Sequence, residues 1–111
     1  MRRKWIEEAL EGTGWTYEEV QAGIDRGDFH LFECEGGCFV GEFIVSPRHT
    51  LFNVWAGGGD LNAIKAMIPM AEAFALRRGC NGIGATGRKG WVRVLEKFGY
   101  KEATPAVEKE L

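Results

Sequence analysis

A basic turn precedes the last predicted helix, in the stretch "GRKGWVRVLEKFGYKE" that covers residues 87–102. Arg88 and Lys89 stand between two glycines at the start of this helix. Two cations placed in this way can bind a phosphate or a carboxylate, and arginine offers two parallel donors to such a group. They also lie at the positive end of the helix dipole, which indicates a partner of negative charge. The alternative is a solvated basic turn that binds nothing.

A second candidate anion site is the glycine run in "VWAGGGDLN", residues 54–62. A helix N-terminus presents unpaired N–H groups and a positive dipole end, which suit a phosphate. Gly57, Gly58 and Gly59 would allow the backbone to approach an anion closely. The alternative is that these glycines only end a strand and that Asp60 caps the following helix.

Transfer of an acyl group to an amine needs a base that removes the proton of the amine. The candidates are Glu33 and Glu42 on predicted strands, His49 in a turn and Asp60 before the long helix. The sequence gives none of them a partner, so it assigns no catalytic residue. His30 and His49 are more simply explained as strand or surface histidines.

The three cysteines, Cys34, Cys38 and Cys80, are an odd number, which favours free thiols over a disulfide framework. Cys34 and Cys38 flank "EGG" and are expected to face each other across a hairpin. A structural zinc is the alternative, but His30 and His49 are the only other soft ligands. We therefore expect buried thiols and no metal.

The composition predicts one globular domain over residues 1–111, with 45% hydrophobic and 27% charged residues. Lysine and arginine number 14 against 16 acidic residues, so the net charge is −2. This charge gives no general attraction to nucleic acid or to an anionic membrane. No apolar run of about 18 residues is present, and acidic residues interrupt the start "MRRKWIEEALEG". We therefore expect an intracellular, cytoplasmic protein.

The first half of the chain predicts two helices and three strands. Apolar spacing predicts a helix over residues 4–11. Thr16 and Glu19 have the form of a capping box, which predicts a second helix over 17–26 that stops at Gly27. "DFHLFECEGGCFVGEFIV" then reads as two strands joined at Gly36-Gly37, and "TLFNVWA" as a third strand paired with the second.

The second half predicts a strand and two helices before a last strand. Asp60 begins a long helix that ends at "RRGC", and "NGIGAT" is a short strand. "RKGWVRVLEKF" is a helix whose apolar face includes Leu95, and "AVEKEL" is the final strand. The order ααβββαβαβ predicts an α/β fold with an antiparallel front half and a crossover-connected back half.

The order of elements, "RRGC" and above all "VLEKFGYKEA" resemble the GCN5-related N-acetyltransferase (GNAT) family, whose members commonly end in a helix followed by Glu-Lys-x-Gly-Phe. The resemblance covers about residues 28–111. It implies the acyl-CoA N-acyltransferase fold, a mixed central sheet flanked by helices. Family members hold acetyl-CoA between the fourth and fifth strands, with the pyrophosphate on backbone amides before the long helix. The cofactor-binding residues implied here are Trp55, Gly57, Gly58, Gly59, Asn62, Arg88 and Lys89.

The chain departs from the family pattern at two places. The family's glycine-containing phosphate motif is absent, and the Asp60 carboxylate would repel a pyrophosphate and occupy its donors. Leu95 stands where family members usually carry the tyrosine that acts as acid for the leaving thiolate. Tyr100 falls at the phenylalanine of the family motif, so it is expected in the core.

Two functions remain from this comparison. In the first, the fold persists without catalysis and the chain is a binding or assembly protein, similar to small acetyltransferase-like proteins of tailed phages, including internal virion proteins of podophages. In the second, it is an acetyl-CoA-dependent N-acetyltransferase acting on an amine. The first is favoured because both departures fall at functional positions. It implies protein partners, a homo-oligomer or a virion, no cofactor, and neither nucleic acid nor membrane binding.

Overall fold

The protein is described here by a computed structural model, which covers residues 2–85, 95–103 and 106–111. It has an α/β fold in which the elements follow the predicted order in the first two thirds of the chain. The elements are α1 (Arg2–Ala9), α2 (Tyr17–Arg26), β1 (His30–Cys34), β2 (Gly37–Ser46), β3 (His49–Gly59), α3 (Leu61–Arg77), β4 (Gly82–Ala85), β5 (Lys101–Ala103) and β6 (Ala106–Glu110).

The described strands form one mixed sheet in the order β1-β2-β3-β4-β6-β5. β3 and β4 are parallel and lie on either side of α3 in the sequence, whereas the other neighbouring pairs are antiparallel. This arrangement confirms the antiparallel front half and the crossover. The end of the chain differs from the expectation of one strand, because β5 and β6 form an antiparallel pair. Most of the helix expected over residues 88–98 lies outside the described residues, although Leu95 and Glu96 are helical.

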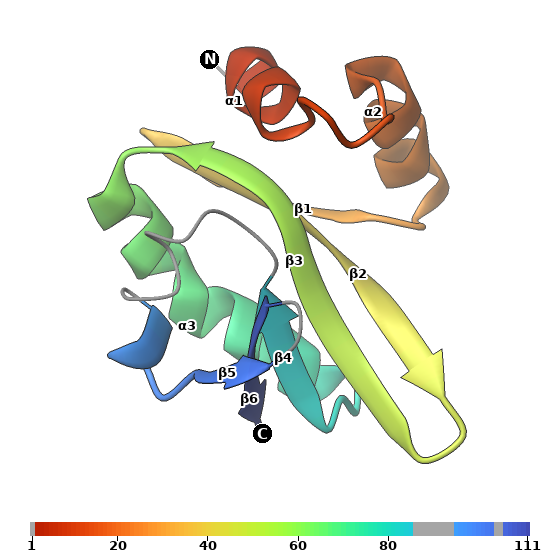
Figure 1. Cartoon of the computed structure of the whole chain (residues 1–111), viewed down its shortest axis with the longest axis vertical. Helices are drawn as coiled ribbons and strands as arrows, with labels where there is room; N and C mark the ends of the chain where they lie inside the picture. Colours follow the sequence, from red (N-terminus) through yellow and green to blue (C-terminus); the bar gives the residue numbers. More distant parts are fainter. Residues whose placement is uncertain (1, 86–94, 104–105) are drawn as a thin grey trace.

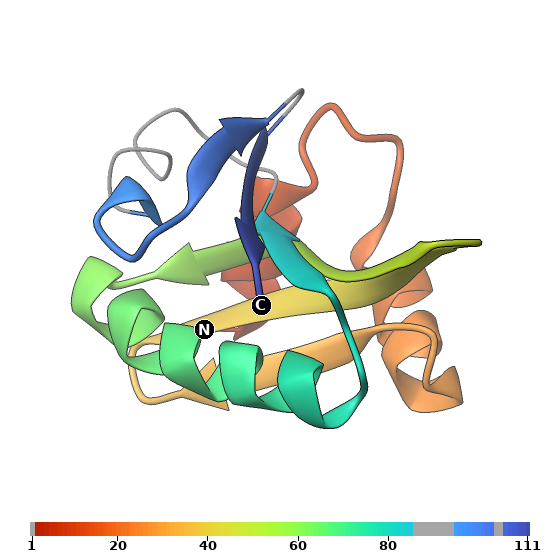
Figure 2. The same cartoon turned by 90° about the horizontal axis from the view of Figure 1, so that it is seen from below.

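The sheet lies between two helical layers (Figures 1 and 2). α3 covers one face, and α1 and α2 cover the other. Each interface has its own core: Phe52, Ile64 and Met67 belong to the cluster under α3, while Ile6 and Val20 belong to the cluster under α1 and α2. Among the residues that the structure describes, no helix has the length and apolar character needed to cross a membrane.

The second helix begins and ends where its local signals predict. The Thr16 hydroxyl accepts a hydrogen bond from the Glu19 N–H, and the Glu19 carboxylate accepts one from the Thr16 N–H at 2.9 Å. Gly27 closes the helix with φ 86°, a conformation that glycine adopts without strain. The capping box therefore fixes the start of α2, and Gly27 ends the helix shortly before the chain enters the sheet at His30.

The β1–β2 hairpin turns one residue earlier than expected. Its two-residue loop is Glu35-Gly36, so Cys34 pairs with Gly37. The prediction that Cys34 and Cys38 face each other is therefore wrong, because successive side chains alternate between faces. Cys38 is fully buried against α1 and α2, whereas Cys34 packs on the α3 side. Burial raises the pKa of the Cys38 thiol to about 11, so this cysteine remains a neutral thiol.

β3 runs through the glycine run and carries a β-bulge. Val40 pairs with Ala56 and Gly41 pairs with Val54, which leaves Trp55 as the extra residue. Val54 packs in the α3-side core, while Trp55 and Ala56 both pack toward α1 and α2. The bulge therefore interrupts the alternation of faces just beyond the last pair between β3 and β4.

Candidate functional site

The N-terminus of α3 is capped by its own aspartate. The Asp60 carboxylate accepts a hydrogen bond from the Asn62 N–H at 3.1 Å, and the Asp60 N–H donates to the Gly36 carbonyl at 2.7 Å. The carboxylate thus occupies the position at which a helix N-terminus would hold a phosphate oxygen. Asn62 itself is exposed on the first turn.

The glycine run is part of β3 rather than a loop. Gly57, Gly58 and Gly59 pair with Phe39, Cys38 and Gly37 of β2. A Cβ atom at Gly57 would lie 2.7 Å from the Phe39 Cβ, and one at Gly58 would lie 3.0 Å from the Trp5 Cβ. Gly59 has φ 115°, where a side chain would collide with the Gly36 carbonyl. Protein atoms therefore fill the space over these glycines, and their side-chain faces do not fit a pyrophosphate.

Beyond the point where β3 and β4 part, the edge of β3 has no neighbouring strand among the described residues. Their last pair is Val54 with Ala85, and β3 continues to Gly59. Strand alternation directs the N–H and C=O of Gly57 away from β2, and within the described part of the chain no backbone group bonds to them. This is the place where the resemblance puts the cofactor.

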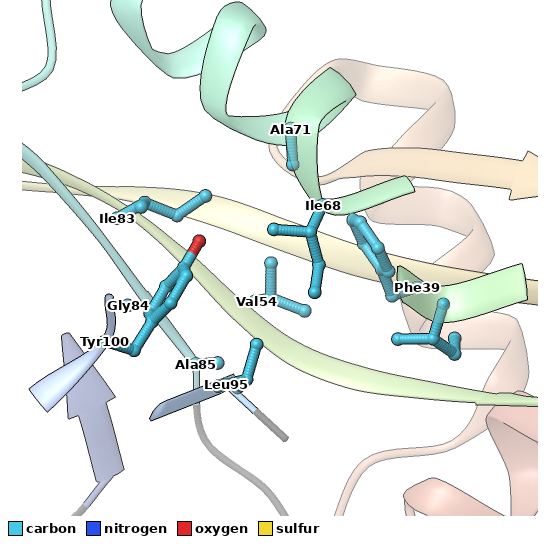
Figure 3. Close-up of a pocket in the computed structure, with 10 residues that line it drawn as sticks. Phe39, Val54, Ile68, Ala71, Ile83, Gly84, Ala85, Leu95 and Tyr100 are labelled. Atoms are coloured by element: carbon cyan, nitrogen blue, oxygen red, sulfur yellow. The ribbon is translucent and has the colours of Figure 1, made fainter. Parts of the chain in front are cut away.

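A small cavity lies between α3 and the parallel strand pair (Figure 3). Its volume is about 30 Å³, which is enough for one water molecule. Its wall is apolar, so such a water would find few hydrogen-bond partners. Leu95 and Tyr100 close it on one side, and Ile68 and Ala71 of α3 on the other. The described lining residues are Phe39, Val54, Ile64, Ile68, Ala71, Ile83, Gly84, Ala85, Leu95 and Tyr100.

A polar network secures Tyr100 beside this cavity. The Tyr100 hydroxyl donates to the Glu72 Oε2 at 2.9 Å, and the Lys109 ammonium donates to the same oxygen at 3.0 Å. Lys109 also donates to the Phe98 carbonyl at 2.9 Å. Burial, and then the negative charge of Glu72, raise the pKa of Tyr100 far above its ordinary value. Tyr100 is buried as expected, and its proton is held by a carboxylate rather than offered to a substrate.

Sequence reasoning missed Glu72 and Lys109. Glu72 lies 28 positions before Tyr100 and 37 positions before Lys109 in the sequence. No local pattern therefore connects the three residues. The one available signal was the spacing of Glu72, four residues after the buried Ile68, which places it beside the apolar stripe of α3.

The residues implied as cofactor-binding do not all come together. Trp55 packs on the opposite face of the sheet, where its ring centroid lies 5.3 Å from that of Phe29 and 5.8 Å from that of Trp15. Its buried indole N–H has no hydrogen-bond partner among the described residues. Arg88 and Lys89 lie outside the described residues. Gly57 to Gly59 and Asn62 therefore remain as the described group at the β3–α3 junction.

The candidate bases are dispersed. Glu33 is exposed and lies 3.3 Å from Arg2 in an ion pair, and His49 is exposed at the start of β3. Burial raises the pKa of Glu42, which lies in the half of β2 that extends beyond its last pair with β1. Glu33, Glu42, His49 and Asp60 are all absent from the described lining of the cavity. The described residues also contain no cluster of three or more His, Cys, Asp or Glu that could hold a metal ion.

His30 is surrounded by aromatic rings rather than by catalytic groups. Its ring centroid lies 5.1 Å from that of Phe43 and 5.2 Å from that of Phe74. The Arg78 guanidinium lies 4.9 Å from the centre of the Phe74 ring. Burial, with the positive charge of Arg78 as a smaller cause, lowers the pKa of His30. The histidine is therefore held in its neutral form.

This pKa predicts a loss of stability in acid. The unfolded chain binds a proton at His30 near pH 6.5, whereas the folded chain resists it, so the free energy of unfolding falls as the pH drops below about 6.5. Urea unfolding at pH 7.5 and 5.5 should show a smaller acid-induced loss for His30→Phe than for the wild type. His49→Gln is the matched control and should retain the wild-type loss. An unchanged loss in His30→Phe would contradict this assignment.

No protein-family model matches the chain, and no curated protein sequence matches it.

Proposed function

We propose that this chain is an acetyltransferase-like domain that has lost acetyl transfer and acts as a binding or assembly protein. The observation that carries the proposal is the β3–α3 junction, where the Asp60 carboxylate occupies the helix N-terminus. Trp5 and Phe39 fill the space above the glycines of β3. A pyrophosphate on the N-terminus of α3 would have to displace the Asp60 cap, and neither face of the glycine strand offers it space.

The likeness to the GNAT fold is supported by the arrangement of the strands. β3 and β4 are parallel neighbours that flank the long helix in the sequence, and they part after Val54 and Ala85. These are the two strands that the resemblance equates with the family's fourth and fifth. In the proposed GNAT-like fold, the parting of β3 and β4 corresponds to the family's cofactor site, and the Asp60 cap occupies the end that would hold the phosphates.

The loss of catalysis is supported by the residues around the cavity. Leu95, at the place of the family's tyrosine acid, is buried and forms part of the apolar wall. Leucine can donate no proton to a leaving thiolate. The nearby Tyr100 hydroxyl is bound to Glu72. The resemblance to phage-encoded proteins makes a virion component one form of the proposed assembly role, with other protein chains as partners.

A second candidate function is acetyl-CoA-dependent N-acetyl transfer to an amine. One observation favours it: the N–H and C=O of Gly57, which have no backbone partner among the described residues, lie on the edge of β3 where β4 has ended. An extended ligand that carries amide groups, such as the pantetheine arm of acetyl-CoA, could pair with this edge.

Calorimetric titration of the full chain with acetyl-CoA separates the two functions. The proposed assembly protein should give no binding heat and no thermal shift at millimolar acetyl-CoA. Asp60→Asn is the informative variant, because asparagine also caps a helix while it removes the negative charge. Weak binding that appears only in Asp60→Asn would identify the carboxylate as the obstacle and support the proposal.

Micromolar binding by the wild type would overturn the proposal and favour the enzyme. The control for that result is Asn62→Glu, which adds a negative charge at an exposed position of the first helical turn. A true pyrophosphate site should lose affinity in this variant. Gly58→Glu is unsuitable as a control because its side chain would strike Trp5 and disturb the docking of α1.

A further inference from the structure

The outer edge of β2 is open along its last five residues. β1 pairs with β2 only from Gly37 to Gly41, so residues 42–46 have no neighbouring strand on that side within the part of the chain that the structure describes. Figures 1 and 2 show the β2–β3 hairpin projecting past β1 and past the helices. An unpaired edge of this kind is a template for another strand.

Strand alternation decides which backbone groups face this edge. A two-residue turn follows Ser46, so Ser46 and every second residue before it exchange hydrogen bonds with β3. The N–H and C=O groups of Phe43 and Val45 therefore point to the open side. No backbone group of the described residues bonds to them.

The side chains along this edge are apolar and accessible. Ile44 is 46% exposed and Val45 is 73% exposed, and alternation places them on opposite faces of the hairpin. Proteins commonly protect such edges with a lysine, a proline or a bulge. Here the run Phe43, Ile44, Val45 contains no such residue, and the first proline, Pro47, comes after the strand has ended.

We propose that this edge pairs antiparallel with the same edge of a second copy of the chain, with the two-fold axis at Ile44. The two residues with outward backbone groups, Phe43 and Val45, are placed symmetrically about Ile44. Phe43 of each copy therefore meets Val45 of the other in a hydrogen-bonded pair, and the two Ile44 side chains lie opposite each other. The inference rests on the proposed assembly role and gives it a surface and a partner.

Charge complementarity selects this occupant. Glu42 and Arg48 have no ion-pair partner among the described residues. Within one copy they are separated by about 15–20 Å of extended chain and turn. In the proposed pairing Glu42 lies opposite Ser46 of the second copy, beside the turn that carries the second copy's Arg48. The pairing thus places a glutamate of one copy near an arginine-bearing turn of the other at both ends, and it places no like charges directly opposite each other.

Sedimentation velocity of the full chain over a concentration series should show reversible dimers. Ile44→Lys and Ile44→Glu should each weaken self-association by about tenfold or more, because two like charges then meet at the two-fold axis. An equimolar mixture of the two variants should restore dimers, since lysine then faces glutamate. This rescue also excludes misfolding as the cause of the loss.

Leu61→Lys is the matched control, since Leu61 is 44% exposed and lies at the first turn of α3, beside the β1–β2 turn and thus at the end of β2 opposite to residues 42–46. It should leave the dimer unchanged. A monomeric wild type, or dimers that survive Ile44→Lys, would overturn the proposal, as would a mixture of the charge variants that stays monomeric. Tight binding of acetyl-CoA would instead overturn the proposed function and leave a dimer of this geometry standing, so the two failures are distinguishable.

Discussion

Replacing Leu95 by aspartate is expected to lower the free energy of unfolding by about 4 kcal/mol or more. Leu95 is 5% exposed and forms part of the cavity wall that Ile68 and Tyr100 complete. The variant loses the burial of a leucine side chain, about 2 kcal/mol, and adds a carboxyl group with no partner, about 2 kcal/mol or more. This sum approaches the lower end of the stability of a domain of this size, about 5–15 kcal/mol.

Urea unfolding followed by circular dichroism measures this loss. Leu95→Met is the matched control, because it conserves volume and should cost less than about 1.5 kcal/mol. Relative to the wild type, Leu95→Asp should be less destabilised at pH 4 than at pH 7, since a buried carboxyl group is cheaper when protonated. Wild-type stability at pH 7 would mean that the side chain of residue 95 does not face the core.

Phe52→Ala should cost about 3–5 kcal/mol. Phe52 is fully buried at the centre of the aromatic cluster on the α3 side, with ring centroids 5.2 Å from Phe43 and 5.4 Å from Phe74. Its ring also occupies the space left by Gly41, where a Cβ atom would collide with it. The substitution removes the ring from the aromatic cluster and from the space beside Gly41. It leaves a cavity that the neighbouring side chains, held by the sheet, can fill only in part.

Leu76→Ala is the comparison for this loss, because a half-exposed leucine on α3 should change the free energy of unfolding by no more than about 0.5 kcal/mol. Both variants are compared with the wild type by urea unfolding at pH 7.5, where His30 is neutral. A cost for Phe52→Ala no larger than that of Leu76→Ala would show that the cluster is not the core of the fold.

Local signals in the sequence were sufficient wherever neighbours in the chain determine the conformation. The capping box of Thr16 and Glu19 and the stop at Gly27 place α2 correctly, because every group involved lies within a few residues. Asp60 caps α3 as predicted for the same reason. The α/β class followed from the change of apolar period along the chain, which depends on which residues share a face.

Features that depend on distant neighbours could not be predicted. The surroundings of the glycine run depend on Trp5 and Phe39, which lie far away in the sequence, so the sequence left open whether these glycines bind an anion or end a strand. The structure shows that they are the last residues of β3. The two-residue loop of the hairpin pairs Cys34 with Gly37 rather than with Cys38, and this one-residue difference puts Cys34 and Cys38 on opposite faces. The network of Tyr100, Glu72 and Lys109 joins residues 28 and 37 positions apart, and the spacing of Glu72 on α3 does not indicate which partners it has.

The bulge at Trp55 also determines where β3 tolerates a change in length. Trp55 is the residue with no counterpart on β2, so deleting it would leave Val54 opposite Gly41 and Ala56 opposite Val40. Deleting a residue elsewhere in the strand would shift every pair on one side of the deletion and turn core side chains outward. In related sequences a one-residue gap within this strand is therefore expected at position 55, and an insertion there would be the change in length that the sheet absorbs most easily.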